Sequence, residues 1–398
     1  MSVVTNLDIG GNTEYALQAA LGAYSHEAYT NARKLTGTGL VSGNPMIDKG
    51  TETYIGQLRW FKPLNPTINT ASLSDSSDGA MTTFESDFLN YIKTVRTHGA
   101  QKVNMSSLVT GVDGLAKVGR DFGETRSQDE HNALLSVLKG VAISEAIHGA
   151  ADMGGTAGLG GQTFDNDPES AKYGFYVDLG AAKPVVDATT SIQGAARAQG
   201  FLDAMGKAWK DYEPDYAYLC CSPEVMASLR SANLVDQDSV SEGNVMFSTI
   251  FDGKFRLIPT RANQGVSTAE LGLLNEGTGV DITGTKTSFI VLPGALAMEQ
   301  LDVPDAVEFD RDASAYQGGG TTEIWYRWGY VIAPAGYSWA GAQTAFPSDA
   351  AYKQVLESST QKDLESVTAT TGMDNTAGIW TRKAQSVLSL GILPVFHS

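Results

Sequence analysis

The stretch DGLAKVGRDFGETRSQDEHNALLSVLKGVAISEAIHG, residues 113–149, decides the fold of this chain. Apolar residues recur along it at the spacing of one helical face, namely Leu115, Val118, Phe122, Leu134, Leu135, Leu138, Val141 and Ile147. Asp113 is a suitable N-cap, and a helix of about 35 residues would extend about 50 Å. Three glycines are expected to weaken this helix and to allow bending: Gly119, Gly123 and Gly140.

Two strand-like runs precede the long helix. Residues 51–63 (TETYIGQLRWFKP) and 88–103 flank a polar stretch at 67–87, which predicts a long hairpin with its tip in that stretch. An isolated two-stranded ribbon is only marginally stable in water, so the hairpin must lie on something else. The body of one subunit has little surface to spare, and we therefore expect a neighbouring subunit to cover it.

Basic residues give this hairpin a local positive charge in an acidic chain. They are Arg59, Lys62, Lys93, Arg96 and Lys102. We expect the hairpin to reach acidic surface on an adjacent subunit, near Asp129 and Glu130. The alternative is that the basic residues are solvated strand edges, which discourage aggregation.

The remaining chain alternates helical and strand patterns. A first helix is expected at 13–33, before the hairpin. A mixed α/β region at 163–285 is expected to contain a helix at 192–210, a strand at 215–221, a helix at 222–230 and a strand at 254–259. Three further strands are expected at 288–292, 303–312 and 321–333. The resulting fold class is α+β.

The last of these strands is rich in aromatic residues. Alternation by two places five large side chains on one face, namely Ile324, Tyr326, Trp328, Tyr330 and Ile332. We expect this face to pack against the Leu134, Leu138 and Val141 face of the long helix and to hold that part of the molecule rigid. The alternative is an aromatic groove for a ligand.

Composition excludes several classes of function. The 398 residues can bury a large core in two or more lobes. A formal net charge of −17 argues against gripping nucleic-acid phosphates or an anionic membrane. No apolar run is long enough to span a bilayer, and no secretory signal is visible. The two cysteines are adjacent, at 220 and 221, which indicates folding in a reducing, intracellular compartment.

Two glycine- or acid-containing motifs have a faint likeness to binding sites. In GVDITGTKT, residues 279–287, Thr285 separates Lys286 from the second glycine, and a strand follows instead of a helix, so a phosphate loop is not expected. Residues 165–169 (DNDPE) lack the glycine and the closing glutamate of a calcium loop.

Two side-chain pairs could in principle carry chemistry. Glu145 and His148 have the Glu-x-x-His spacing of a di-iron bundle, but a second copy is missing. Cys220 and Cys221 follow an apolar strand without a nearby histidine, so at least one is expected to be a buried apolar residue. The sequence therefore predicts no enzyme, with no catalytic residue, cofactor or metal site.

The order of parts resembles that of the major capsid proteins of tailed bacteriophages, which have the Hong Kong 97-type fold. Local phrases carry the same resemblance. They are DGLAKVG at 113–119, NALLSVLKG at 132–140, SPEVMASLR at 222–230 with NLVD at 233–236, VEFDRD at 307–312, GGGTTEI at 318–324 and VIAPAGYSW at 331–339.

The resemblance implies a division of the chain into five parts. They are an N-terminal arm at 1–48, an extended β-hairpin loop at 49–108, a spine helix and the start of the peripheral domain at 109–161, an inserted axial domain at 162–285, and peripheral-domain strands with a C-terminal segment at 286–398. Few lysines lie in the extended loop, so self-catalysed cross-linking is not expected.

The resemblance also implies a function. The chain would be a structural shell protein that self-assembles, as hexamers and pentamers, into an icosahedral phage head enclosing double-stranded DNA. Its partners would be itself, a separate scaffolding protein, a portal and decoration proteins, with only non-specific proximity to DNA and no membrane. Assembly would take place in the host bacterial cytoplasm, and the mature location would be the virion. The alternatives are an encapsulin-type nanocompartment shell and a soluble intracellular α/β enzyme.

Overall fold

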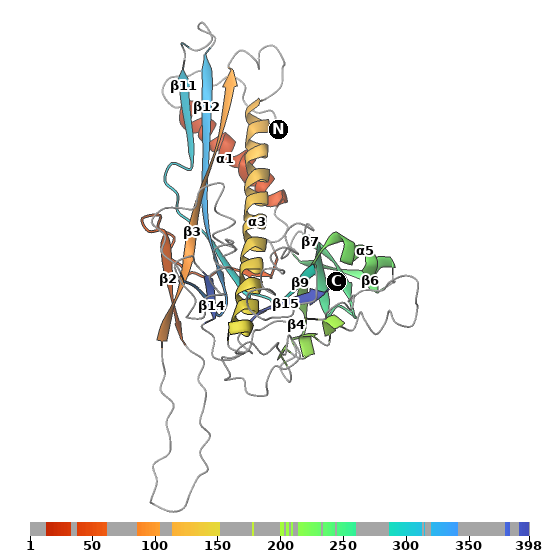
Figure 1. The fold of residues 1–398 in the computed structure, drawn as a ribbon. Helices are drawn as coiled ribbons and strands as arrows, with labels where there is room; N and C mark the ends of the chain where they lie inside the picture. The colour runs from red at the N-terminus through yellow and green to blue at the C-terminus, as the bar shows by residue number, and fades with distance from the viewer. Residues whose placement is uncertain are drawn as a thin grey trace, which may run out of the picture.

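The computed structural model describes residues 13–32, 38–61, 86–103, 114–151, 177–178, 200–209 without 203 and 207, 214–231, 234–242, 245–259, 286–312, 314, 320–340, 379–382 and 390–397. Helices and strands are mixed in this α+β structure, as the sequence predicts. Figure 1 shows a tall ribbon of strands beside one long helix, with a separate sheet on the other side of that helix.

The tall ribbon is built on one strand of 18 residues, β3 (Ser86–Val103). Its first part pairs antiparallel with β2 (Ile55–Phe61) as a hairpin. Its second part, from Lys93 onward, pairs antiparallel with β12 (Thr321–Pro334). The expectation that the strand at 88–103 lies on a neighbouring subunit is therefore wrong for its second half, which lies on a strand of its own chain.

Three short strands complete this six-stranded sheet around β12. β11 (Val307–Asp312) pairs with the start of β12, and β10 (Leu296–Gln300) pairs with its end. β1 (Val41–Ser42) adds to β10 in parallel. The β2–β3 hairpin and β11 thus lie at opposite ends of the ribbon (Figure 1).

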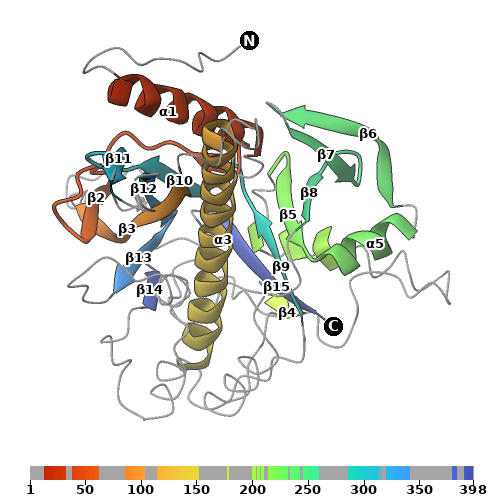
Figure 2. The same cartoon turned by 90° about the horizontal axis from the view of Figure 1, so that it is seen from above.

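The long helix α3 (Gly114–Ala151) contains 38 residues, close to the predicted range of 113–149. It packs on β12 and β3, and the first helix, α1 (Thr13–Ala32), packs on it. Figure 2 shows α3 in the middle of the molecule, with the ribbon on one side, the second sheet on the other and α1 across one end.

The second sheet has seven strands in the order β4, β15, β9, β5, β8, β7 and β6. Their bounds are Val177–Asp178, Ile392–His397, Lys286–Val291, Ala217–Cys221, Phe255–Pro259, Val245–Ile250 and Val235–Glu242. α5 (Pro223–Ser231) follows β5 and contacts β8.

This sheet draws strands from both sides of the expected boundary at residue 285. β9 begins at Lys286 and pairs with β5, and β15, near the end of the chain, pairs with β9. Strand pairing is non-local, so a pattern read along the chain does not reveal which sheet a strand will join. A further C-terminal strand, β14 (Ile379–Arg382), pairs with β13 (Tyr337–Ala340), which contacts β3.

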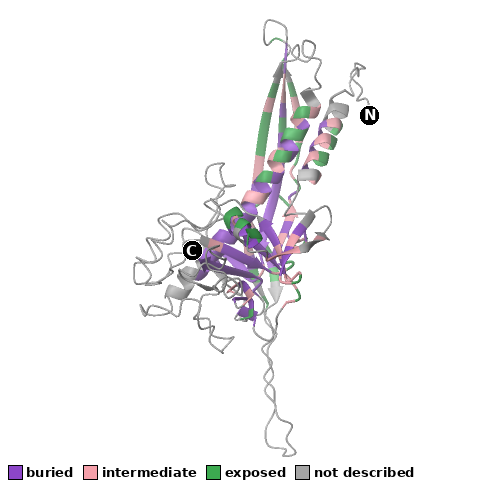
Figure 3. Cartoon of the chain, turned by 90° about the vertical axis from the view of Figure 1, so that its right-hand side faces the viewer, coloured by how far each residue is buried: buried purple, intermediate pink, exposed green. Residues whose placement is uncertain are grey.

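Most of the core lies where α3 meets both sheets, as the buried segments in Figure 3 indicate. The predicted helix face is buried, with Leu134, Leu138 and Val141 at most 1% exposed. A smaller apolar cluster covers the other face of the ribbon near the hairpin and includes Leu58, Tyr91 and Val331. The end of β12 is therefore buried on both faces.

Candidate functional site: the junction of α1, α3 and the ribbon

The aromatic face of β12 packs on α3, and its described contacts there are with Phe122 and Asp129, while a contact with the predicted Leu134, Leu138 and Val141 face stays a prediction. Ile324, Tyr326, Trp328 and Tyr330 are all buried. The ring of Tyr326 stacks on Phe122 of α3 at a centroid distance of 5.4 Å and an interplanar angle of 8°. This face is filled by side chains of the same chain, so an aromatic ligand groove is not present there among the described residues.

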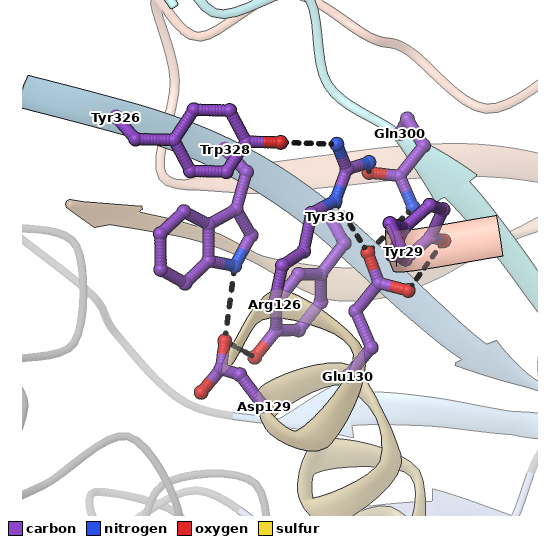
Figure 4. Close-up of polar contacts among 8 residues, drawn as sticks. All are labelled: Tyr29, Arg126, Asp129, Glu130, Gln300, Tyr326, Trp328 and Tyr330. Atoms are coloured by element: carbon purple, nitrogen blue, oxygen red, sulfur yellow. Dashed lines mark hydrogen bonds and ion pairs between the residues drawn. The ribbon is translucent and has the colours of Figure 1, made fainter. Parts of the chain in front are cut away.

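Asp129 of α3 binds the ribbon through its carboxylate. The indole Nε1 of Trp328 donates to Asp129 Oδ2 at 3.2 Å, and the Tyr330 hydroxyl donates to the same oxygen at 3.0 Å. Arg96 Nε of β3 lies 3.5 Å from the other oxygen. Figure 4 shows the two contacts with β12, and Arg96 adds one from β3, so this buried carboxylate contacts both long strands of the ribbon.

Glu130, the next residue, binds different elements. The Tyr29 hydroxyl of α1 donates to Glu130 Oε2 at 2.6 Å, and Gln300 Nε2 of β10 donates to Oε1 at 3.0 Å. Arg126 Nε, one turn earlier on α3, donates to the same Oε1 at 3.1 Å. Glu130 is completely buried, and this burial raises its pKa even though the three donors act in the opposite direction.

Arg126, which binds Glu130, also contacts the ribbon and α1. Its guanidinium donates to the Tyr326 hydroxyl at 3.1 Å and to Gln300 Oε1 at 2.6 Å, and it lies 4.3 Å from the ring centroid of Tyr29. Burial acts to lower the pKa of Arg126, but the charges of Tyr326 and Glu130 outweigh it and the pKa is raised. The group therefore stays charged, and the contacts in Figure 4 close around it.

These contacts correct the expected role of two acidic residues. Asp129 and Glu130 were expected to offer acidic surface to the hairpin of an adjacent subunit. Both are buried, at 8% and 0% exposure, and Arg96 meets Asp129 within one chain. A list of charges along the chain cannot tell a contact within a subunit from one between subunits.

Lys93 is also satisfied within its own chain. Its side chain is fully buried, and Nζ donates to Asp48 Oδ2 at 2.6 Å, to the Gly50 carbonyl at 2.6 Å and to Thr53 Oγ1 at 3.2 Å. The hydrogen bond from Lys93 holds the pKa of Asp48 below its usual value. Lys93 therefore ties the segment before β2 to β3 and is not available to a neighbour.

The other basic residues of the hairpin differ. Arg59 is exposed and lies 5.8 Å from the ring centroid of Phe88 on the paired strand. Phe88 is itself 48% exposed, which is unusual for an aromatic side chain. Lys62, the side chain of Lys102 and residues 67–85 of the tip expected at 67–87 lie outside the described residues.

Two glycines of α3 form the seat of α1. A Cβ on Gly123 would lie 2.3 Å from the Ser25 carbonyl oxygen, and one on Gly119 would lie 2.8 Å from Cβ of Tyr24. The helices can approach this closely only without those side chains. Gly119 and Gly123 were expected to weaken or bend the helix; in the structure α3 is continuous through both, and their four-residue spacing was the available signal.

The weak chemical motifs yield no site in the described residues. Cys220 and Cys221 are both buried, and burial raises the pKa of Cys221 to about 12 and that of Cys220 further, so neither is a thiolate near neutral pH. Residues 286–291 form β9, the strand predicted after the glycine-rich motif, while 279–285 and 165–169 lie outside the described residues.

The Glu-x-x-His pair is described only in part. Glu145 is buried in α3, and the side chain of His148 is not described. Within the described ranges, no three potential metal ligands come together. In the same ranges, none of the helices combines the length and the apolar character needed to cross a membrane.

Comparisons with known proteins find similarity only among solved structures. No model of a protein family matches the chain, and no curated protein matches it. The capsid of Ralstonia phage GP4 is 12% identical with a TM-score of 0.43, and the match covers 77% of this chain and 86% of that one. The acid-stable capsid of Helicobacter pylori bacteriophage KHP30 is 9% identical with a TM-score of 0.45, covering 100% and 99%.

A third similar structure is also a phage head. The head of Helicobacter pylori bacteriophage KHP40 is 9% identical with a TM-score of 0.42, and the match covers 88% of this chain and 86% of that one. Identity and TM-score are low in all three cases. The structures to which this chain is similar are capsids and heads of phages.

Proposed function

We propose that this chain is a structural shell protein with the Hong Kong 97-type fold, which self-assembles into the icosahedral head of a tailed phage around double-stranded DNA. One observation carries the proposal. A single strand, β3, belongs to a hairpin at one end and to a ribbon at the other, and that ribbon is fixed along a helix of 38 residues. This arrangement suits a tile whose hairpin contacts a neighbour while its spine stays in place.

The five expected parts fit this proposal with one change. Residues 1–48 are the arm, 49–108 the extended loop and 109–161 the spine helix with the start of the peripheral domain. The axial domain, expected at 162–285, shares its sheet with β9 and β15 from the final part at 286–398. β15 of this sheet contacts α3, so the two lobes are joined by more than a linker.

Contacts between copies are proposed at the hairpin. Phe88 and Arg59 form an exposed aromatic and cationic pair there, and large exposed apolar side chains are a common feature of protein interfaces. Because Lys93 and Arg96 are satisfied within the chain, Arg59 and Phe88 are the described hairpin residues best placed to contact a neighbour. Copies would assemble as hexamers and pentamers.

Further partners follow from the same proposal. They are a scaffolding protein, a portal and decoration proteins, with packaged DNA held without specific contacts because the chain is acidic. The protein would reside in the virion and assemble in the host bacterial cytoplasm. No catalysis is proposed, since the buried ionisable groups described at the junction bind one another and leave no described cleft for a substrate.

Electron microscopy of the purified full-length chain, alone and co-expressed with the phage's other head proteins, tests the proposal. We expect hollow regular shells. A protein that remains a monomer or dimer under both conditions contradicts it. Nuclease treatment of the purified shells, followed by extraction of the protected nucleic acid, separates a phage head from a nanocompartment, because only the first would contain this chain together with packaged DNA.

Two variants sharpen this test. Phe88→Ser and Arg59→Glu change the exposed pair without removing a buried side chain, so both are expected to fold and to assemble poorly. Met46→Ser is the matched control, because Met46 is 75% exposed and lies outside the hairpin. Normal shells from Phe88→Ser and Arg59→Glu would show that the hairpin surface is not the contact.

A further inference from the structure

α1 packs along α3 and also contacts β11. Leu21, Ser25 and Tyr29 are its buried residues in the range whose burial is described, and they form one stripe at intervals of four. Ser25 is polar and bonds within the helix, to the Gly22 carbonyl. The seat beneath the stripe is Gly119 and Gly123, which present backbone instead of apolar side chains. The described part of α1 is therefore held by close packing on the two glycines and by a polar contact at Tyr29.

The polar contact at the end of this stripe joins α1 to Glu130 of α3. Tyr29 is the residue through which α1 reaches the junction, with its hydroxyl on Glu130 and its ring against Arg126. Glu130 is at 0% exposure with Tyr29 above it, while Gln300 and Arg126 approach from β10 and from α3 itself. If α1 lifted, water would reach Glu130, whereas the contacts from β10 and α3 would stay.

We propose that α1 docks on α3 with uptake of a proton at Glu130, so that lower pH seats the helix and higher pH loosens it. The physical reason is the cost of burying a carboxylate. Covering Glu130 removes it from water and penalises the charged form, and the hydrogen bonds from Tyr29 and Arg126 do not fully compensate. A neutral carboxylic acid avoids this cost and can still accept from the Tyr29 hydroxyl.

The sign of the effect follows from linkage. Burial raises the pKa of Glu130 in the docked state, and lifting α1 removes that cause, so the docked state binds the proton more tightly. Docking is therefore fully favoured below the pKa of the lifted state and weakens as pH rises through the raised pKa. This direction is opposite to that of a carboxylate held by a dominant salt bridge.

Glu130 faces ionisable groups from three other positions in the fold. Arg126 faces it from α3, Tyr29 from α1, and Tyr326 of β12 meets it through Arg126. Asp129 points instead to β12 and β3, where Trp328, Tyr330 and Arg96 contact it. His26 is an exposed histidine of α1 itself, so its titration must be removed separately.

Hydrogen exchange of the full-length chain measures the proposal directly. In a His26→Gln background, protection factors of the α1 amides, corrected for the intrinsic exchange rate, are followed from about pH 5 to about pH 8. We expect protection to fall with rising pH, by up to about tenfold per pH unit for one linked proton. Protection that is constant, or that increases with pH, overturns the proposal.

Three variants assign the effect to Glu130. Glu130→Gln imitates the neutral acid, and it should keep α1 protected at all of these pH values. Asp129→Asn is the matched control, because this neighbouring buried carboxylate contacts the ribbon and not α1, and it should retain the pH dependence. Tyr29→Phe removes a donor that favours the ionised form, so the dependence should move to higher pH.

Each outcome of these variants decides the question. A Glu130→Gln protein whose α1 is loose at every pH would mean that the ionised carboxylate holds the helix, and the proposal would be wrong. The same conclusion follows if Glu130→Gln keeps the original pH profile. If Glu130→Gln does not fold, the original profile and the direction of the shift in Tyr29→Phe still decide.

Discussion

The two sides of α3 are held together by different chemistry. On the ribbon side, three ionisable residues are buried against polar partners: Lys93, Asp129 and Glu130. α3 itself buries two further ionisable residues, Lys139 and Glu145. In the part of the seven-stranded sheet that the structure describes, the buried polar side chains are all uncharged types or histidine, namely Thr249, Ser288 and His397. Its centre is apolar, with Leu219 and Ile290 at 0% exposure.

This difference matches the shapes of the two sides. A ribbon of long strands beside a long helix can slide along its own length with little loss of apolar contact. A slip of one residue reverses every side chain of a strand, and a slip of two would separate Asp129 from Trp328 and Tyr330. Leaving a buried charge without its partners is costly, so we infer that these pairs set the register of the ribbon against α3.

The seven-stranded sheet needs no such device. Its strands are short, and β5 is flanked by β8 on one side and by β9 on the other. Every residue of β5 is buried, which fixes it from both faces and both edges. The one short buried polar contact described between β9 and β15, from Ser288 to His397 at 2.8 Å, lies inside an already closed arrangement.

The largest expected effect tests whether the ribbon depends on its aromatic face. Replacing Trp328 with alanine removes a buried aromatic side chain and one donor to Asp129, and it should lower the free energy of unfolding by about 3–5 kcal/mol. Chemical denaturation followed by circular dichroism measures this. A loss that large should leave little soluble folded protein at elevated temperature.

The neighbouring tryptophan is the control. Trp325 lies on the opposite face of β12 and is 39% exposed, with its ring against Gly99 of β3. Trp325→Ala should cost clearly less than Trp328→Ala. Equal losses of unfolding free energy for the two variants would show that the α3 face of the ribbon contributes no more to stability than the opposite face. A folded Trp328→Ala protein that only loses a bound small molecule would restore the ligand-groove interpretation.

The sequence predicts the parts of this comparison that depend on local patterns, but not the contacts between residues far apart along the chain. The helix at 113–149, the strand at 88–103 and the aromatic face of 321–333 follow from periodicity along the chain, and the structure contains all three. The partners of Asp129 and Glu130 do not, because residues more than 100 positions away supply four of the six. The membership of β15 in the second sheet is hidden for the same reason.

A smaller effect is expected from removing the buried cation at the base of the hairpin. Lys93→Met keeps the apolar stem but removes the charged donor to the Gly50 carbonyl and the Thr53 hydroxyl, which should cost about 1.5–3 kcal/mol because hydrogen bonds to a charged group are the stronger kind. Asp48 is 58% exposed and can be solvated by water instead. Denaturant unfolding of the variant measures the loss.

The pH dependence of the same pair gives an independent check. Because Lys93 lowers the pKa of Asp48, the contribution of this pair is present above the usual aspartate pKa of about 3.9 and is lost as pH falls through the lowered value. Lys93→Met should therefore reduce the loss of stability in that acid range. Lys49→Met is the control, since its pair with Glu299 at 2.9 Å is largely exposed on the lysine side and should change the unfolding midpoint little.

The smallest expected effect concerns the seat of α1 on Gly119 and Gly123. This seat has neither the buried polar pairs of the ribbon side nor the apolar centre of the seven-stranded sheet. Gly123→Ala places a methyl group within 2.3 Å of the Ser25 carbonyl, so α1 must shift away. Overpacking of this kind costs about 1–3 kcal/mol, partly offset by the better helix propensity of alanine, about 0.5–1 kcal/mol. We expect α1 to lose hydrogen-exchange protection while α3 and β12 keep theirs.

Gly22→Ala separates the contact from the propensity. Gly22 lies in α1 and has no atom within 4 Å of an added Cβ, so the same substitution there should raise the protection of α1 slightly. Opposite signs for the two glycines would show that the close helix approach, and not helix strength, keeps α1 seated. If both variants raised the protection, α1 would not depend on the Gly123 seat, and Tyr29 with Glu130 would have to hold it alone.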